Sequence, residues 1–590
     1  MCGIFGYFGK KENAGEIVFH GLRRLDYRGY DSWGIGMLDG DSIVVTKQAG
    51  KIPQTITSLP TSSIAIGHTR WATHGGVTKN NAHPHFATDH SFILAQNGIV
   101  ENYQSLKQKL QKKGYAFSTE TDTEVIVRLI EDKNKRANNF IDAVRTAFHD
   151  LTGRNTIVLL TKDGTVIGAR NGSPLVLGIG KSKGELFLSS DILSFAPYVE
   201  KTVVLENQQI VEITNNKFRI ISINTGKQEK YRTEKNTISN TRVDKDGFDH
   251  FMLKEIYESP FVIEQIYNQD ARMLKQLALK IKHAKHVYAI GSGTAGAAAA
   301  QIAYYLRIYG SMHAVSLIGA EASDYYHLFT KDDVIIAPSQ SGETADVLEA
   351  LEHARSKKTK IASLVNMPGS MITRMSDYPF MSMAGPEICV MSTKIFVSQI
   401  AWGYLLAKTV QGNYSEGKRN LQSLARVMSD YLHSKNVLTQ IKSLADRLKQ
   451  SKHIFLLGKA QNLQIVKEGM VKLVEGSYIH AHALPAGDLK HYAITLMEPG
   501  VSVIVVISND EVKEDVLNAV NEVNARGASV IGISPANHER FTFHLQVSDL
   551  GETSAILTIL PLQLLAYYLA VALGNNVDKP RNIAKSVTVK

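Results

Sequence analysis

The sequence predicts an α/β protein of several domains, in which an N-terminal domain precedes two doubly wound parallel-sheet domains. The chain has 590 residues, enough for about four domains. Its 44% hydrophobic and 21% charged residues are typical of a folded globular protein. The first third contains short strand-like runs that end in polar loops. The rest of the chain repeats one pattern of apolar runs and helix-length segments, which indicates the two sheets.

The internal repeat is visible in three pairs of apolar runs, separated by 167 to 169 residues. The pairs are 286–291 with 453–458, 334–339 with 503–508, and 361–365 with 530–534. Uninterrupted apolar strands that alternate with helices are typical of parallel sheets covered on both faces. Ligands of such sheets lie at the carboxyl ends of the strands.

The first third alternates strands with loops that carry functional side chains. We expect strands at 4–9, 64–67 and 92–95, a helix over 14–25, a turn at 27–32 and a second helix opening at 119–124. The loops are rich in Arg, Trp, His, Asn and Gly, and loops on a rigid scaffold often carry function. Each loop also has a plainer interpretation: Asn97-Gly98 could be a hairpin turn, and Arg70 could be a surface cation.

Three further segments set the boundaries. Residues 227–248 are polar and read as a linker, and a helix over 250–260 is expected to stop at Pro260. Residues 555–574 carry no charge and could span a membrane by length. Because this segment contains Pro561, Gln563 and two tyrosines, we interpret it as a buried helix and expect no membrane partner. No secretory signal is recognised.

Charge and cysteine content exclude several classes of function. The net charge of +10 is spread along the chain, which argues against nucleic acid and suits anionic sugar phosphates. Two cysteines, Cys2 and Cys389, cannot form a disulfide framework, so a cytoplasmic protein is expected. Cys389 lies among apolar residues and is expected to be buried and inert. His74, His83 and His85 have no carboxylate or thiol between them, so we expect no metal. No cofactor is expected either.

Cys2 is the first candidate nucleophile. If Met1 is removed, Cys2 carries both a thiol and an α-amine that titrates near neutrality and can accept the thiol proton. The alternative is an unremarkable residue on a frayed terminus.

Six segments of the first domain stand out together: Cys2-Gly3-Ile4, 27–32, 68–75, 81–85, Asn97-Gly98 and 120–124. Over roughly the first 220 residues, these motifs resemble the N-terminal-nucleophile (class II) glutamine amidotransferase family. The resemblance implies a four-layer α/β/β/α fold and a glutaminase domain over residues 2–225. Trp33 and Gln96 depart from the usual pattern without removing a catalytic group.

The resemblance also implies roles for single residues. Cys2 would attack the side-chain amide of glutamine, and Asn97 with the Gly98 N–H would stabilise the oxyanion. Arg70 would bind the glutamine α-carboxylate and Asp122 the α-ammonium group. Trp71 and Arg28 would belong to the loops that close over the site and connect it to the acceptor, and Trp71 and His74 would also bind glutamine.

In the first repeat, two strand ends carry hydroxyl groups. Thr294 follows the first strand, and Ser339, Gln340, Ser341 and Thr344 follow the next and open a helix. Hydroxyl groups and free N–H groups at a helix N-terminus can bind phosphate. Ordinary N-capping is the alternative. The spacing does not match an ATP-binding P-loop.

These strand ends resemble the sugar-isomerase (SIS) domain, present twice, and the whole order resembles the isomerizing glutamine–fructose-6-phosphate aminotransferase family. Further matching segments are 385–388, 392–394, 468–475, 477–481, 487–491 and 578–589. The resemblance implies SIS domains at 276–417 and 443–580, a linker and connecting helix at 226–275, and a C-terminal catalytic tail at 581–590.

For the isomerase half, the resemblance implies that Lys585 forms an imine with the ketose and that Glu475 moves a proton between C1 and C2. Lys472 would stabilise the enolamine, and His491, reaching in from the second subunit of a homodimer, would open the sugar ring. Ser392 joins the sugar-phosphate contacts.

The implied reaction converts fructose 6-phosphate and glutamine to glucosamine 6-phosphate and glutamate, with internal transfer of ammonia. Ala295, His482 and Tyr492 depart from the family pattern near the sugar site. Two alternatives therefore stay open: a different sugar-phosphate acceptor, and a sugar-phosphate-binding regulator with degenerate catalysis.

Overall fold

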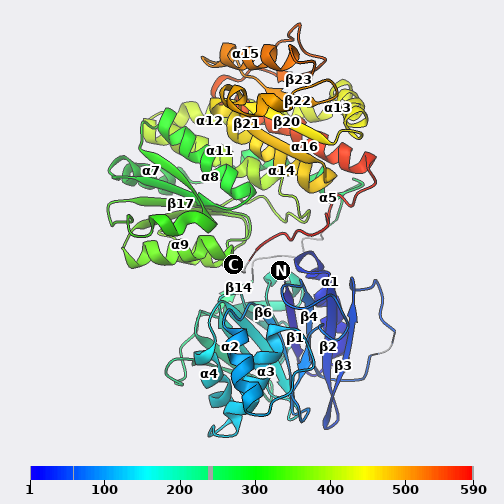
Figure 1. Ribbon diagram of the computed structural model, residues 1–590. Helices are drawn as coiled ribbons and strands as arrows, with labels where there is room; N and C mark the ends of the chain where they lie inside the picture. Colours follow the sequence, from blue (N-terminus) through cyan, green and yellow to red (C-terminus); the bar gives the residue numbers. More distant parts are fainter. Residues whose placement is uncertain (1, 58, 237–243, 588–590) are drawn as a thin grey trace. The chain divides into compact units, whose positions relative to one another are not determined.

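The computed structural model describes residues 2–57, 59–236 and 244–587 (Figure 1). The chain divides into two compact units, unit 1 (Met1–Arg242 with Ser586–Lys590) and unit 2 (Val243–Lys585). Met1, part of the expected linker (237–243) and the last three residues of the expected catalytic tail (588–590) lie outside the described residues.

Unit 1 contains two antiparallel sheets. The eight-stranded sheet has the order β14-β11-β9-β10-β1-β4-β2-β3 and the six-stranded sheet the order β13-β12-β8-β7-β6-β5. The strands of the first sheet are β1 (Gly3–Phe8), β2 (Ser32–Asp39), β3 (Ser42–Ala49), β4 (Ile64–Arg70), β9 (Val176–Gly180), β10 (Leu186–Ser189), β11 (Val199–Val204) and β14 (Glu234–Lys235). Those of the second are β5 (His85–Phe86), β6 (Phe92–Gly98), β7 (Asn155–Thr161), β8 (Val166–Asn171), β12 (Gln209–Thr214) and β13 (Lys217–Ser222).

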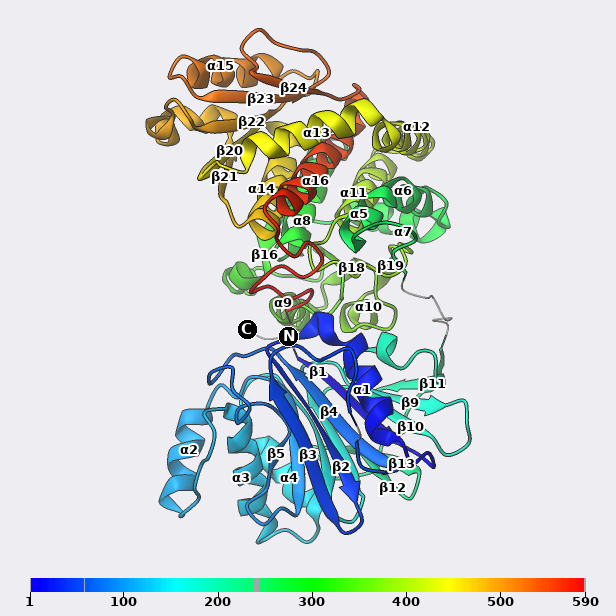
Figure 2. The same cartoon turned by 90° about the vertical axis from the view of Figure 1, so that its right-hand side faces the viewer.

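The two sheets pack face to face between helical layers (Figure 2). Apolar side chains from both sheets, such as Ile4 and Ile93, share one core. Helix α1 (Ala14–Arg24) buries its apolar face on the eight-stranded sheet. Helices α2 (Tyr103–Lys112), α3 (Asp122–Asn134) and α4 (Phe140–Asp150) cover the six-stranded sheet. These layers confirm the expected α/β/β/α fold.

Unit 2 contains two five-stranded parallel sheets of identical topology, β16-β15-β17-β18-β19 and β21-β20-β22-β23-β24. The first comprises β15 (Val287–Gly291), β16 (Ala314–Ile318), β17 (Val334–Ser339), β18 (Lys360–Val365) and β19 (Tyr378–Met381). The second comprises β20 (His453–Gly458), β21 (His480–Pro485), β22 (Ser502–Val506), β23 (Ser529–Ser534) and β24 (Phe543–Gln546). The repeat and the doubly wound sheets predicted from the sequence are confirmed.

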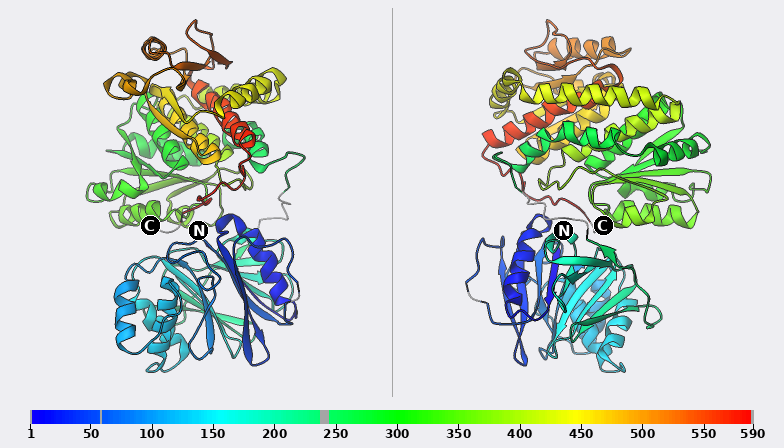
Figure 3. Two further views of the ribbon diagram at one scale, coloured as in Figure 1. Left: turned by 45° about the vertical axis from the view of Figure 1, so that its right-hand side comes forward. Right: turned by 180° about the vertical axis from the view of Figure 1, so that it is seen from behind.

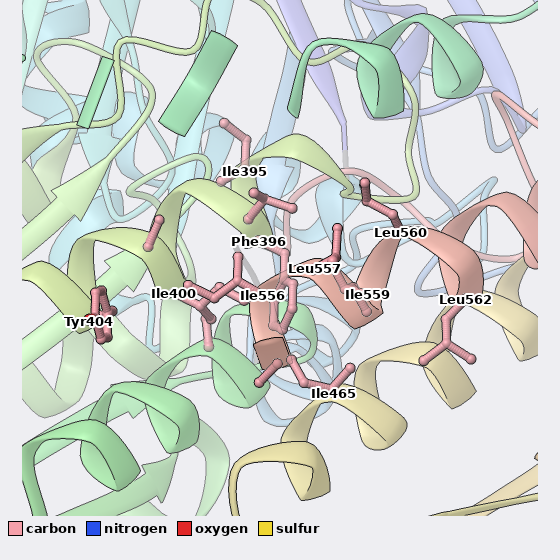
Figure 4. Close-up of a cluster of buried hydrophobic side chains, with 14 of the residues drawn as sticks. Ile395, Phe396, Ile400, Tyr404, Ile465, Ile556, Leu557, Ile559, Leu560 and Leu562 are labelled. Carbon is pink, nitrogen blue, oxygen red and sulfur yellow. The ribbon is translucent and has the colours of Figure 1, made fainter. Parts of the chain in front are cut away.

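Helices cover both sheets of unit 2 and fill the space between them (Figure 3). They are α5 (Phe251–Tyr257), α6 (Ser259–Tyr267), α7 (Ala271–Lys282), α8 (Thr294–Ile308), α9 (Ala345–Ser356), α10 (Met371–Met375), α11 (Lys394–Gln411), α12 (Tyr414–His433), α13 (Lys435–Leu448), α14 (Leu463–Ser477), α15 (Lys513–Asn524) and α16 (Ser554–Ala572). Figure 4 shows Ile400 of α11, Ile465 of α14 and Ile556 of α16 within one apolar cluster.

Two segments differ from, or sharpen, the sequence-based expectations. Pro260 does not simply stop a helix: α5 ends at Tyr257, and Pro260 lies in the first turn of α6, where a missing N–H carries no penalty. Both short helices pack in the core of unit 2. The segment Gly551–Ala572 is long and apolar enough to cross a membrane, but 83% of its apolar window is buried inside unit 2. This burial agrees with the expected core helix.

Candidate functional site

Cys2 lies immediately before β1, a central strand of the eight-stranded sheet. Its Sγ accepts a hydrogen bond of 3.3 Å from the Trp71 backbone N–H, at the end of the neighbouring strand β4. Burial raises the pKa of the Cys2 thiol, while the Trp71 N–H and the Arg70 cation act to lower it. The thiol therefore needs a base close by to become a nucleophile at neutral pH.

The backbone carbonyl of Cys2 accepts hydrogen bonds from two side chains, those of Arg28 and Asn97. Arg28 donates from Nε to the Cys2 carbonyl at 3.4 Å and forms a 3.0 Å ion pair with Asp191. Arg28 was expected in a loop that closes over the site, and in the structure it is only 5% exposed and contacts the main chain of the expected nucleophile. The side chain of Asn97 donates from Nδ2 to the same carbonyl at 3.2 Å.

Asn97 and Gly98 end strand β6 of the other sheet and do not form a hairpin turn. Gly98 has a φ of +126°, and a Cβ there would lie 1.9 Å from the Arg154 carbonyl oxygen. Only glycine fits this conformation. The pair expected to form an oxyanion hole is therefore held in one defined backbone geometry beside Cys2.

Arg70 is buried, which excludes the surface-cation alternative. Its guanidinium donates to the backbone carbonyls of His74, Gly75 and Gly76. In this conformation Arg70 holds the 74–76 loop with at most three of its five N–H groups, and its expected role toward a carboxylate stays a prediction.

Asp122 and His74 are the other two expected glutamine-binding residues, and they lie together. The Asp122 Oδ1 and His74 Nδ1 atoms are 4.0 Å apart. The second Asp122 oxygen accepts the Val100 N–H at 2.8 Å. Burial raises the pKa of Asp122, opposed by that N–H group and by His74. A carboxylate in this position attracts a cationic group such as an ammonium.

In unit 2, the loops after β15 and β17 flank the point where the strand order reverses, where parallel sheets bind ligands. Ser339 and Ser341 accept hydrogen bonds from the N–H groups of Gly342 and Glu343, at 2.9 and 3.2 Å. Thr344 is the N-cap of α9 but makes no side-chain capping bond. The two serine side chains thus accept hydrogen bonds from N–H groups of their own loop, and Thr344 does not cap the first turn of α9. A helix N-terminus without a side-chain cap is suited to binding an anion.

A polar cluster joins α8 to α14. Lys472 Nζ lies 2.5 Å from Glu475 Oε2, 3.5 Å from Glu468 Oε1 and 3.2 Å from Thr294 Oγ1. The Thr294 hydroxyl donates to Glu468 at 3.0 Å. Burial raises the pKa of Glu468 to about 7, against the Lys472 cation. Sequence reasoning assigned no role to Glu468, although its i, i+4 spacing to Lys472 predicts the contact.

A second cluster surrounds Lys585. Its ammonium forms a buried ion pair with Glu387 and donates to the Cys389 carbonyl at 2.6 Å. Glu387 also accepts from the Ser392 hydroxyl at 2.9 Å and the Thr393 N–H at 2.9 Å. The surface-lysine alternative is therefore wrong, since only 3% of the Lys585 side chain is exposed.

Glu255 supports this second cluster from α5. It accepts the N–H groups of Ile388 and Cys389. The same short segment contains both partners of Lys585, the Glu387 carboxylate and the Cys389 carbonyl. Burial and the neighbouring Glu387 raise the pKa of Glu255 to about 8. Sequence reasoning missed both glutamates: Glu387 had only its place after Gly385-Pro386 as a signal, and Glu255 had none.

Cys389 lies near both clusters, because its carbonyl accepts a hydrogen bond from Lys585 and its thiol lies within range of Lys472. Cys389 itself is fully buried, as expected. His491, at the end of a short 3-10 helix (Ala486–His491), is exposed and makes no hydrogen bond or ion pair with either cluster among the described residues of this chain. Within the part of the chain that the structure describes, no group of three His, Cys, Asp or Glu side chains could hold a metal ion.

Comparisons with known proteins match both halves of the chain. The model of the glutamine amidotransferase domain matches residues 44–225, and that of the SIS domain matches residues 280–409 and 447–573. The C-terminal domain of a glucosamine–fructose-6-phosphate aminotransferase from Francisella tularensis superposes with a TM-score of 0.52 at 29% identity. It covers 57% of this chain and 99% of that one.

Full-length relatives carry one name. Glutamine–fructose-6-phosphate aminotransferases (isomerizing) from Aquifex aeolicus and Pyrococcus horikoshii are 37% and 36% identical, each covering 100% of both chains. The two kinds of domain, in this order and at this identity, show that the chain belongs to the family of isomerizing glutamine–fructose-6-phosphate aminotransferases.

Proposed function

We propose that the protein converts fructose 6-phosphate and glutamine to glucosamine 6-phosphate and glutamate. The observation that carries this proposal is the presence of two separate half-sites in one chain. Unit 1 holds a thiol beside amide donors, and unit 2 holds a buried lysine beside two carboxylate clusters. A glutaminase alone does not need the second half-site.

In the first half-reaction, removal of Met1 leaves the α-amine of Cys2 as the base for its own thiol. The thiolate attacks the amide carbon of glutamine, whose oxyanion is stabilised by Asn97 Nδ2 and the Gly98 N–H. Ammonia leaves, and water hydrolyses the thioester to glutamate. Arg70 and Asp122, with His74 and Trp71 nearby, bind the amino-acid end of glutamine.

In the second half-reaction, His491 from a second copy of the chain opens the sugar ring. The Lys585 amine and the C2 carbonyl of fructose 6-phosphate condense to an imine and release water. Ammonia displaces Lys585 to give the C2 ketimine, and Glu475 takes a proton from C1 and returns one to C2. The product is a 2-amino aldose, and no oxidant is consumed. Lys472 balances charge on the enolamine, and Glu387 accepts the Lys585 proton.

The phosphate of the sugar is assigned to the loop after β17, with Ser339, Gln340, Ser341 and Thr344. Thr294 and Ser392 are assigned to the sugar itself. Their hydroxyl groups already contact Glu468 and Glu387, which links substrate binding to the two carboxylate clusters. A homodimer in the cytoplasm, with ammonia passed on without release, completes the proposal.

The test is to incubate pure protein with glutamine and fructose 6-phosphate and to measure glucosamine 6-phosphate and glutamate. The two products are expected in equal amounts, and Cys2→Ala is expected to abolish both. Glutamate without amino sugar would favour a different acceptor. Sugar-phosphate binding with neither product would favour a regulator.

A further inference from the structure

His68 lies between the two sheets of unit 1, at a position that none of the glutamine contacts uses. It belongs to β4 of the eight-stranded sheet, where it pairs with Ile4 of β1, two residues beyond Cys2. Its Nε2 is 2.9 Å from the Gln96 backbone oxygen and 3.2 Å from Asn97 Oδ1, both in β6 of the other sheet. His68 is thus a polar bridge from the sheet that carries Cys2 to the sheet that carries Asn97.

The chemistry of the contacts fixes the tautomer of His68. Both atoms that face Nε2 are carbonyl oxygens, which only accept hydrogen bonds, so Nε2 carries the hydrogen. Nδ1 is buried and has no hydrogen-bond partner among the described residues, so nothing stabilises a second proton there. Burial also lowers the pKa of His68 to about 3, which keeps the ring neutral at working pH.

The same contacts fix the orientation of the Asn97 amide. Oδ1 accepts from His68, and Nδ2 donates to the Cys2 carbonyl at 3.2 Å. Rotating the amide by 180° would set Nδ2 against the His68 N–H and Oδ1 against the Cys2 carbonyl. Two donors would then face each other, and so would two acceptors. The donor of Asn97 is therefore presented to the nucleophile because His68 occupies its oxygen.

We propose that His68 is a positioning residue for glutamine hydrolysis: it orients the Asn97 amide so that Nδ2 faces the oxyanion formed at Cys2. This inference rests on the proposed role of Asn97. His68 does not touch the substrate. Its effect is expected in kcat, because the oriented donor acts on the transition state, and not in the KM for glutamine.

The test measures glutaminase kcat and KM in the full-length protein. His68→Met removes the donor but fills the space with an adaptable side chain, and kcat is expected to fall about tenfold, the equivalent of one lost hydrogen bond. His68→Gln restores an N–H donor and is expected to stay within about threefold of the wild type. His85→Leu removes a histidine that is equally buried but contacts Thr121 and not Asn97, and it is the matched control.

A double-mutant cycle separates positioning from general damage to the fold. In an Asn97→Ala background, His68→Met is expected to change kcat by less than about twofold, because the amide it orients is gone. Full additivity of the two losses, wild-type kcat in His68→Met, or equal losses in His68→Gln and His68→Met would overturn the inference. If His68→Met does not fold, a His68→Gln kcat as low as that of Asn97→Ala overturns it. Wild-type protein without glutaminase activity would instead refute the proposed function, and full activity of Asn97→Ala would refute the role of Asn97.

Discussion

Replacing Lys585 by methionine removes an ammonium group while keeping most of the aliphatic stem. The lost ion pair is buried, with the Glu387 side chain fully buried and the Lys585 side chain 3% exposed. Removing one partner of such a pair costs about 3–5 kcal/mol, because the remaining charge is left without compensation. Glu387 would keep its hydrogen bonds from Ser392 and Thr393 but is expected to take up a proton.

Most of this cost is expected to appear as undocking of the tail and not as global unfolding, since Lys585 lies close to the chain end. Asp578, which accepts the N–H groups of Phe251 and Met252, and Arg581, which stacks on Tyr478, hold the preceding residues. Three to five kcal/mol corresponds to a loss of about 150- to 4,000-fold in the docked population. Hydrogen exchange at residues 583–587 measures it directly.

Activity gives the second readout of Lys585→Met. Amino-sugar formation is expected to be lost, while glutamine hydrolysis by unit 1 continues. Borohydride treatment with fructose 6-phosphate should trap a covalent adduct on wild-type protein and none on the variant. Lys579→Met, six residues before Lys585 in the sequence, is the control and should behave as wild type. Amino-sugar formation that survives in Lys585→Met, or an adduct on another lysine, would refute the assignment of Lys585 as the imine-forming residue.

Two further predictions address the folded state of unit 1 and the sugar site of unit 2. Burial lowers the pKa of His68 to about 3 and lowers the pKa values of His83 and His85 well below the ordinary histidine value. In the folded protein these imidazoles therefore stay neutral, whereas in the unfolded chain they take up protons below about pH 6.5. The free energy of unfolding of unit 1 is therefore expected to fall as pH drops below about 6.5, by up to about 1.4 kcal/mol per pH unit for each histidine. Urea unfolding followed by near-ultraviolet circular dichroism tests this expectation. A urea midpoint that does not change between pH 4 and 6.5 would contradict it. Gly342 has a φ of +67°, and a Cβ there would lie 2.0 Å from Ser370 Oγ, so Gly342→Ala should distort the loop after β17. The KM for fructose 6-phosphate should rise at least about tenfold, about 1.4 kcal/mol, with glutamine hydrolysis unchanged; an unaltered KM would remove this loop from phosphate binding.

The regular elements of the fold could be predicted because their signals are local. Three pairs of apolar runs at a nearly constant spacing predicted two parallel sheets, and both sheets have the same strand order. The helix expected to open within 119–124 is α3, which begins at Asp122 after the N-cap Thr121, whose side chain accepts the Glu124 N–H. Pro260 misled because proline ends one helix and begins another equally well, and only the packing of α6 decides between them.

The residues of the candidate site could be predicted only where they belong to a recognisable sequence motif. Cys2, Asn97 and Lys585 stand in recognisable segments, and the structure finds all three in defined polar surroundings. His68 makes its contacts across 28 and 29 residues of sequence and Glu255 across 133 and 134, and no local sequence pattern indicates such contacts. Such groups become visible only when folding brings a buried polar atom against its partner.

In the proposed reaction, nitrogen passes from glutamine to the sugar within one protein. The most direct measurement supplies glutamine labelled with ¹⁵N in its side-chain amide, fructose 6-phosphate and an excess of unlabelled ammonium. Mass spectrometry of the amino sugar then reports the source of its nitrogen. We expect glucosamine 6-phosphate that carries the ¹⁵N label. Unlabelled amino sugar, or labelled ammonia with no amino sugar, would contradict it.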